Sequence, residues 1–288
     1  MCGNFLLIYP TRQLTVFGVT FTMPGAGWGV AGAAAATVTA TAFSAICLLS
    51  VLFVRKGPLQ ISLKDSYRPR PDILKQAVHL GVPTFLERAT VAVGQIAATA
   101  MISGLGTVAL ASNQLALTGE SICYMPIFGF SIAATTLVAQ NLGAGDKERA
   151  FKQGAWCTWI SVAVIFTAGV IQFILSEQII DLFSNDPAVI ALGGKMLRIE
   201  AFAESFFAIT TVLSGVLRGA GDTKWPFYIT AVCNWSIRAL GAVLCIRVFG
   251  MGLPEAVICM CLDNTVRMFW MGARFRSGKW QAVLASKS

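Results

Sequence analysis

Long apolar blocks separated by short polar loops are the main pattern of this 288-residue chain. Asp, Glu, Lys and Arg are absent from four long stretches, 13–54, 89–119, 121–145 and 153–176. A helix of about 20 apolar residues spans the hydrocarbon core of a bilayer, whereas a core helix of a soluble domain does not need that length. The pattern therefore predicts an all-α polytopic membrane protein.

The blocks predict about eight spanning helices, at 3–22, 28–54, 76–103, 109–140, 153–175, 193–217, 225–247 and 253–273. The first is the weakest, because Pro10 and Arg12 interrupt it, and we interpret it as a truncated helix. The polar stretch 55–75 predicts a linker. The expected organisation is a two-helix segment at 1–54, this linker, a six-helix unit at 76–275 and a basic tail at 276–288.

Composition and charge fit a membrane location. Hydrophobic residues make up 56% of the chain and charged residues 12%, whereas a soluble domain carries about 25% charged residues. The net charge of +8 does not indicate nucleic-acid binding, because Lys and Arg lie in short loops between apolar blocks. These basic loops alternate with neutral or acidic ones such as 177–187. The positive-inside rule places the basic loops in the cytoplasm.

No pattern for catalysis or metal binding is found in the sequence. Seven of the eight cysteines lie at or inside apolar blocks, and the Cys259-x-Cys261 pair has no His near it. Free Cys commonly behaves as a small buried hydrophobe, so neither a metal site nor a disulfide framework is expected. The only histidine, His79, lies at the predicted cytoplasmic edge of a helix. We expect a non-enzyme without a cofactor.

Two short loops repeat one pattern. Each follows an apolar helix on the predicted cytoplasmic side: 141–147 reads NLGAGDK, and 217–224 reads LRGAGDTK. Glycine accepts the positive φ that ends a helix, and Asp can cap the helix that follows. The residues expected to carry the pattern are Gly143, Gly145, Asp146, Arg218, Gly219, Gly221 and Asp222. Their placement in alternate loops predicts internal repetition, which is common in transporters.

The chain resembles the multidrug and toxic compound extrusion (MATE) family, within the larger superfamily that also holds lipid and polysaccharide flippases. The matching stretches are LVAQNLGAGD at 137–146 and VLRGAGDTK at 216–224, with support from GVAGAA at 29–34 and GVP at 81–83. Several such motifs in the right order are much more specific than one GAGD alone. The resemblance covers most of the chain.

The resemblance implies two six-helix bundles related by pseudosymmetry. By this comparison, 1–54 is the end of an N-terminal lobe and 76–275 is a whole C-terminal lobe. The expectation is a truncated chain, without about the first four helices and the cation-binding carboxylate they carry. The implied function is export of cationic or amphipathic compounds across the bacterial inner membrane in exchange for H⁺ or Na⁺. The implied partners are the lipid bilayer and a small organic cation.

Acidic residues inside the apolar blocks are the candidate coupling groups, because intramembrane charge is costly and usually functional. By resemblance to the NorM-like branch, Glu87 is the best match for a cation-binding Glu. Glu120, Glu200 and Glu204 are candidates for the same polar cavity, and Glu200 and Glu204 are one helical turn apart. The alternatives are structural pairs with Arg88, Arg238 or Arg267, and a solvated Glu200 near Lys195 and Arg198. Asp263 and Arg267, spaced i, i+4, predict a local ion pair.

Aromatic and other large side chains supply candidate walls for a substrate cavity. We expect cavity residues among Tyr124, Met125, Phe128, Phe202, Phe206, Phe207 and Arg238, through stacking and cation–π contact. At helical spacing the same residues also suit core packing or contact with lipid.

Two other hypotheses stay open. One is a flippase of the same superfamily for a lipid-linked or anionic substrate, whose cavity would be lined by basic residues such as Arg88 and Arg238. The other is a non-transporting membrane fragment that associates only with partner helices.

Overall fold

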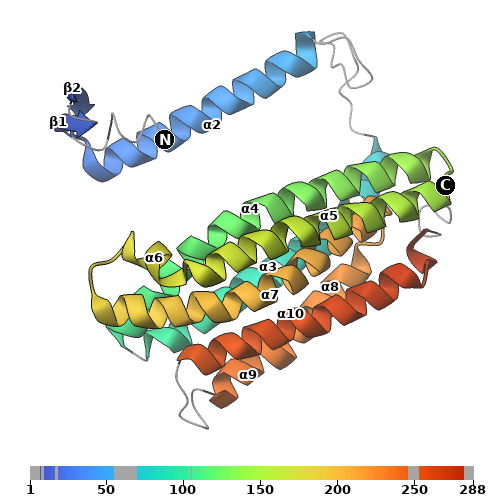
Figure 1. The fold of residues 1–288 in the computed structure, drawn as a ribbon. Coiled ribbons are helices and arrows are strands. Elements are labelled where there is room, and N and C mark those ends of the chain that lie inside the picture. Colours follow the sequence, from blue (N-terminus) through green and yellow to red (C-terminus); the bar gives the residue numbers. More distant parts are fainter. Residues whose placement is uncertain are drawn as a thin grey trace. The chain divides into compact units, whose positions relative to one another are not determined.

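The fold is seen in a computed structural model that describes residues 7, 10–16, 19–54, 70–104, 106–245 and 253–281. The chain divides into two units, Met1–Arg70 and Pro71–Ser288, and each is described by itself. Helices dominate both units (Figure 1). The described residues contain five helices long and apolar enough to cross a membrane: α2, α3, the second half of α4, α5 and α7. The polytopic helical class is confirmed, while the count of eight spans is not.

The first unit contains an antiparallel pair of strands where the sequence pattern predicted a spanning helix, so that prediction is wrong. Strand β1, Pro10–Val16, pairs antiparallel with β2, Val19–Ala26, in a register that places Gln13 opposite Thr22. Thr and Val occur in both strands and Phe in β2, and these residue types favour a pleated sheet over a helix. Apolar content alone did not reveal this difference.

Helix α2, Gly29–Val54, confirms the second predicted segment. Small residues fill its first half, and most of its apolar side chains are exposed within its own unit, as Val30 and Phe43 show. A 26-residue helix is about 39 Å long, which is enough to cross the hydrocarbon core. Residues 55–69, most of the predicted linker, lie outside the described residues.

The second unit is a bundle of long helices (Figure 1). Its elements are α3 Pro71–Ser103, α4 Thr107–Gly143, α5 Lys147–Ile174, α6 Ser176–Asp181, α7 Pro187–Gly219, α8 Lys224–Cys233, a π-helical turn η1 Asn234–Ala239, α9 Leu240–Val243, α10 Leu253–Arg276 and a short 3₁₀ turn η3 Lys279–Gln281. Helix α3 starts at Pro71 and so includes the last residues assigned to the linker. These helices coincide with the six segments predicted for this part of the chain.

The tail does not leave the bundle directly after α10. Trp280 is fully buried, stacks on Phe275 and donates a 2.8 Å hydrogen bond from Nε1 to the Phe275 carbonyl oxygen. Residues 276–281 therefore pack against the helices, although the sequence pattern assigned them to the tail.

Helix α7 lies at the centre of the second unit and packs against α4, α5, α6 and α10. Its closest approach is to α4, where Gly215 and Gly219 face backbone atoms of Ser131 and Thr135. The Ser131 and Thr135 hydroxyls donate to the carbonyl oxygens of Thr211 and Gly215 at 2.8 and 2.9 Å. Glycines spaced by four residues allow this packing, because small side chains let helix backbones approach closely in membranes.

A methyl group at this contact is expected to destabilise the bundle. In Gly219→Ala the added Cβ would overlap the Thr135 carbonyl oxygen, and overpacking of this kind costs about 1–3 kcal/mol. The measurement is the unfolding midpoint of purified protein in detergent. The control is Gly129→Ala, because a Cβ at Gly129 meets nothing within 4 Å. Equal midpoints for the two variants would contradict the packing argument.

The two GAGD loops end their helices in the same way. Gly145 and Gly221 have φ of 80° and 77°. The backbone N–H groups of Asp146 and Asp222 each donate at 2.9 Å to a carbonyl oxygen of the last helical turn. This is the Schellman arrangement, and it confirms the predicted role of glycine at both loops.

The two aspartates of these loops differ from one another. Asp146 caps α5, accepting a 2.8 Å hydrogen bond from the Arg149 backbone N–H, as predicted. The cap prediction is wrong for Asp222, which is buried and accepts two hydrogen bonds from Arg274 on α10, at 2.7 and 2.9 Å. In the bond to the guanidinium both partners are charged, whereas at a helix cap only the carboxylate is, so Asp222 pairs with Arg274 instead of capping α8.

Candidate functional site

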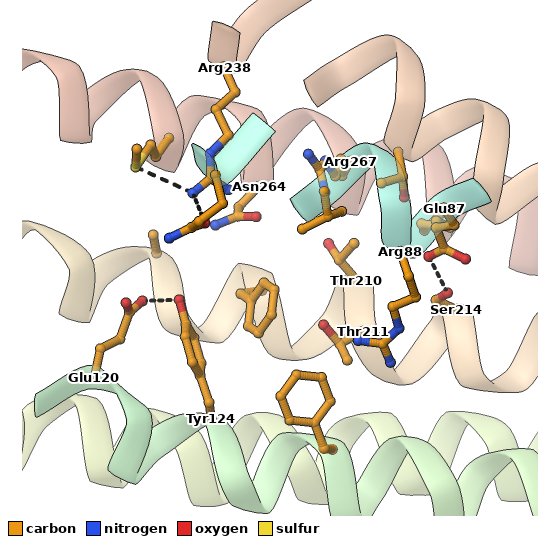
Figure 2. A pocket seen from close by; sticks show the side chains of 18 of the residues that line it. Glu87, Arg88, Glu120, Tyr124, Thr210, Thr211, Ser214, Arg238, Asn264 and Arg267 are labelled. Carbon is orange, nitrogen blue, oxygen red and sulfur yellow. Dashed lines mark hydrogen bonds between the residues drawn. The ribbon is translucent and has the colours of Figure 1, made fainter. Parts of the chain in front are cut away.

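A cavity of about 410 Å³ lies inside the second unit, between α3, α4, α7, η1 and α10. Figure 2 shows its polar side chains pointing inward from these elements. The polar and aromatic residues of its wall are Glu87, Arg88, Gln95, Glu120, Tyr124, Phe128, Glu200, Phe207, Thr210, Thr211, Ser214, Arg218, Thr230, Arg238, Asn264 and Arg267.

One end of the cavity is acidic. Glu120 on α4 and Glu200 on α7 are 7% and 8% exposed, and the Tyr124 hydroxyl donates a short hydrogen bond to Glu120 (Figure 2). Oε2 of Glu200 has no hydrogen-bond partner in the described part of the chain. Neither Glu has an ion-pair partner among the described residues. Both acids are therefore buried at the cavity, and Glu200 is not solvated as the alternative had it, while their role in coupling stays a prediction.

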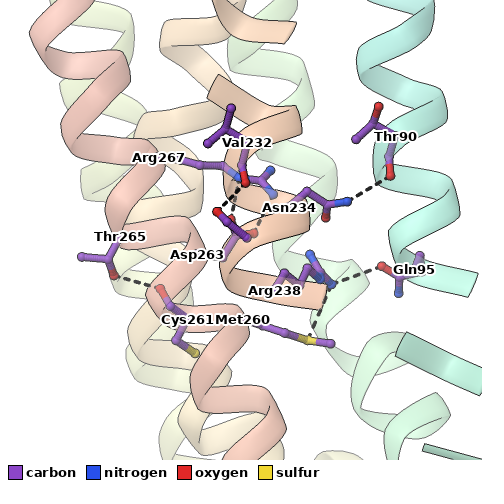
Figure 3. A network of polar contacts seen from close by, with 11 residues as sticks. Thr90, Gln95, Val232, Asn234, Arg238, Met260, Cys261, Asp263, Thr265 and Arg267 are labelled. Atoms are coloured by element: carbon purple, nitrogen blue, oxygen red, sulfur yellow. Dashed lines mark hydrogen bonds and ion pairs between the residues drawn. The ribbon is translucent and has the colours of Figure 1, made fainter. Parts of the chain in front are cut away.

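Arg238, on the π-helical turn, is the basic group nearest this acidic end. It acts electrostatically on both Glu120 and Glu200. Its Nη2 donates to Gln95 Oε1 at 3.3 Å and contacts the Met260 sulfur at 3.6 Å (Figure 3). A π-turn inside a helix often marks a functional position, and here it carries the guanidinium predicted to line the cavity.

The opposite end of the cavity holds an ion pair. Arg218 Nη2 lies 2.9 Å from Glu87 Oε1 and also donates to Ser214 Oγ at 2.9 Å. Glu87 is buried, as predicted, but its partner is none of the three arginines that the sequence offered. Arg218 was expected only as a loop residue. At the last turn of α7 its long side chain reaches across to α3, which sequence spacing alone does not reveal.

Arg88 lies next to Glu87 in sequence but makes a different contact. Its guanidinium lies over the Phe128 ring, 5.7 Å from the centroid, within the range of a cation–π interaction. Both ends of the cavity therefore contain arginines, and one of these, Arg218, is neutralised by a carboxylate.

A polar network joins α3, the π-helical turn and α10 beside the cavity (Figure 3). Asp263 and Arg267 form the predicted ion pair, at 2.6 Å, and both are buried. Asn234 donates from Nδ2 to the Thr90 carbonyl oxygen at 3.0 Å. The network holds together the helices that carry Arg238 and Arg267. Because Asp263 balances the charge of Arg267, this arginine does not present a net positive charge to a ligand.

The aromatic residues divide between the cavity and the outside of the unit. Tyr124, Phe128 and Phe207 line the cavity. Met125 and Phe206 do not line it, so the structure does not support their expected place there; Met125 is 73% exposed. Successive residues of a helix point about 100° apart, so an inward Tyr124 turns Met125 outward. Phe202 is 71% exposed and packs edge-on against Phe173.

Glu204 is buried but lies behind the cavity wall. It is 1% exposed and does not line the cavity, whereas Glu200, one turn away, does. Its Oε2 faces Gly169 of α5. The two acids share the buried side of α7, as expected, but only one of them reaches the cavity.

Sequence reasoning missed several polar wall residues. Thr210, Ser214 and Arg218 follow Glu200 and Phe207 along one face of α7, at spacings of three, four or seven residues. This helical periodicity was a usable signal, because the same face already carried an acid. Asn264 had no comparable signal, since it lies between the paired Asp263 and Arg267 on α10.

Comparisons with known proteins agree with this architecture. A probable multidrug resistance protein NorM of Thermotoga maritima is 33% identical over 96% of this chain, and the multidrug resistance protein MdtK of Proteus mirabilis is 28% identical over 93%. The chain spans 59% and 56% of the length of these two proteins.

Solved structures show the same fold. A crystal structure of MATE in the straight conformation superposes with a TM-score of 0.79 at 20% identity, covering 88% of this chain and 58% of that chain. A MOP superfamily transporter from Pyrococcus furiosus gives the same score and coverage. The MatE family model matches residues 83–244 of the 288. Because this match covers more than half of the chain, the chain belongs to the MatE family.

Proposed function

We propose that this chain forms the coupling and substrate-binding part of a secondary antiporter. It would export cationic or amphipathic organic compounds across a bacterial plasma membrane, in exchange for H⁺ or Na⁺. The single observation that carries the proposal is the acidic end of the cavity, where Glu120 and Glu200 are buried beside Tyr124 with no ion-pair partner in the described structure.

The cavity wall suggests how exchange would work. Glu87 is neutralised by Arg218 and Asp263 by Arg267, so each of these two acids already has a cationic partner. Glu120 and Glu200 are close enough to interact, and an ionised carboxylate in this setting is costly. A proton, a small cation or a cationic group of a substrate can each neutralise them. Because these ligands compete for the same oxygens, uptake of one favours release of the other.

The aromatic wall fits an organic cation. Tyr124 and Phe207 lie with ring centroids 4.9 Å apart, next to the acidic end. Ring faces attract cations, and pockets for organic ligands are mainly apolar with a few placed polar groups. The multidrug resistance names of the relatives point the same way. Arg218 and Arg267 are neutralised, whereas Arg88 and Arg238, on which the flippase alternative rests, line the cavity without an ion-pair partner among the described residues. The unpaired Glu120 and Glu200 favour a cationic substrate over an anionic lipid-linked one.

Transport by reconstituted protein tests the proposal. Proteoliposomes would be loaded with a fluorescent organic cation and given an inward H⁺ or Na⁺ gradient in separate experiments. We expect one of the two gradients to drive release of the cation, and release to stop when that gradient is collapsed. Release at the same rate without any gradient, or no release under either gradient, would contradict antiport.

A further inference from the structure

Glu204 lies in a polar pocket that the cavity does not explain. Its neighbours are Cys123 on α4 and Gln172 on α5. The Cys123 thiol donates to Gln172 Oε1 at 3.2 Å. Gly169 makes room for the acid, because a Cβ there would lie 3.2 Å from Glu204 Oε2. Helix α5 thus provides both the space and a polar neighbour for a carboxyl group inside the membrane.

Several polar atoms along this side of α5 have no protein partner in the described residues. They are Nε2 of Gln172, Oγ of Ser176 and both carboxyl oxygens of Glu204, which lie near the Cys123 thiol and the Gln172 amide but form no hydrogen bond of regular geometry with them. An unpaired buried polar group costs about 1–3 kcal/mol, and such groups are usually satisfied by ordered water. Three unpaired positions in succession therefore favour a hydrated path over a set of independent defects.

The unpaired polar groups lie in order from the outer end of α5 toward Glu204. Gln172 and Ser176 are one helical turn apart at the end of α5, and Ser176 begins α6. The next residue, Glu177, has a side chain that is 50% exposed and pairs with Arg198. This end of α5 faces the acidic loop, which the positive-inside rule places outside the cell. At the other end, Glu204 interacts electrostatically with Glu120 and Glu200 at the cavity.

We propose that Ser176, Gln172 and Glu204 form a proton-uptake route from the outer surface to Glu200 and Glu120. The route deepens the proposed function and rests on it. A proton from outer water passes along bridging water to Glu204, where an O–H bond forms. Glu204 then gives a proton to Glu200 or Glu120 and returns to its ionised form. The net change is the transfer of one proton from the outside to the cavity.

The surroundings of Glu204 fit a proton better than Na⁺. Hard cations need about six oxygen ligands, whereas Glu204 faces a thiol and an amide. No group of three His, Cys, Asp or Glu residues suited to a metal ion occurs in the part of the chain that the structure describes. The titratable groups facing Glu204 are Glu120 and Cys123 from α4 and Glu200 from α7. Arg238 faces Glu120 and Glu200 rather than Glu204.

The test compares Glu204→Gln and Gln172→Leu with Ser161→Ala, in the full chain reconstituted in proteoliposomes. Ser161 is a matched control, because it is a buried residue of α5 with an unpartnered hydroxyl far from the outer end. Proton uptake is followed with a pH dye, and binding of a fluorescent organic cation is measured at fixed pH. We expect both test variants to lower proton uptake, and Glu204→Gln to lower it at least about a hundredfold, the low end for a positioned proton-transfer group.

Binding of the organic cation should stay within about twofold in both test variants, a change of less than 0.5 kcal/mol. Ser161→Ala should match the wild type in both assays. Wild-type proton uptake by Glu204→Gln would overturn the route, and so would a parallel loss of uptake and cation binding, because Glu204 would then belong to the cavity or to the fold.

Infrared difference spectra separate this inference from the proposed function. Glu120 and Glu200 contribute to the protonated-carboxyl band of the purified wild type, and we expect this band to contain a further component that titrates with pH and that is lost in Glu204→Gln, whether or not any compound is transported. A wild type that transports nothing but shows this component would contradict the antiporter proposal and would still support a Glu204 that titrates. An unchanged band in Glu204→Gln would contradict the proton route and would leave the antiporter proposal unaffected.

Discussion

Replacing Glu120 and Glu200 together by Gln is expected to abolish selective binding of organic cations and its dependence on pH. Both carboxylates lie at the acidic end of the cavity without an ion-pair partner in the described residues. A hydrogen bond to a charged group contributes about 1.5–3 kcal/mol, so we expect Kd to rise about 10- to 100-fold. Gln keeps the size of Glu but cannot be ionised, so the variant isolates the charge.

The pH dependence gives the sharper readout. In the wild type a proton and the organic cation compete for the same oxygens, so cation affinity should rise as the pH is raised. In the double variant the affinity should be low and flat across the same range. Fluorescence titration of purified protein measures both. Glu148→Gln is the control, because Glu148 is highly exposed and pairs with Lys152 at the cytoplasmic end of α5. A double variant that keeps the wild-type slope would remove these acids from the mechanism.

Removing Arg218 should have the largest effect on stability. In Arg218→Gln the carboxylate of Glu87, whose side chain is 9% exposed, loses its 2.9 Å partner. Breaking a buried pair from one side costs about 3–5 kcal/mol, and the 21% exposure of Arg218 points to the low end of that range. Removing the uncompensated charge as well, in Glu87→Gln with Arg218→Gln, should recover most of this loss.

A double-mutant cycle measures this coupling through unfolding of the four proteins in detergent. The control pair is Arg149 and Asp146, which is 3.7 Å apart with side chains 69% and 43% exposed. Exposed pairs of this kind contribute about 0–1 kcal/mol, so Arg149→Gln should be nearly neutral. If Arg218→Gln were equally neutral, the pair would not hold α3 to α7. Undiminished cation transport by Glu87→Gln would confine Glu87 to this structural role.

Much of the fold and part of the site were predictable from the sequence. Stretches without charge located α2, α4, α5 and much of α3, and apolar blocks with a few charges located the remaining helices of the second unit, because lipid demands long apolar helices. Local chemistry located the GAGD turns and the Asp263–Arg267 pair, since both depend on residues at most a few positions apart. Intramembrane acids located Glu120 and Glu200 because their burial is too costly to be accidental. In each case the deciding interaction is with the solvent or with the same short segment.

What only the tertiary structure decided is which side chains meet across helices. In the structure Glu87 pairs with Arg218, and Met125 points away from the cavity. Asp222 binds Arg274 instead of capping α8, and Glu204 lies against α5 rather than in the cavity. The tertiary structure also paired 10–16 with 19–26 as antiparallel strands, where hydropathy alone suggested a helix. The reason is that a helix of given sequence can be rotated or shifted against its neighbours without changing its own pattern. The choice depends on packing, such as the Gly215 and Gly219 contact with α4, and packing is a property of the assembled bundle.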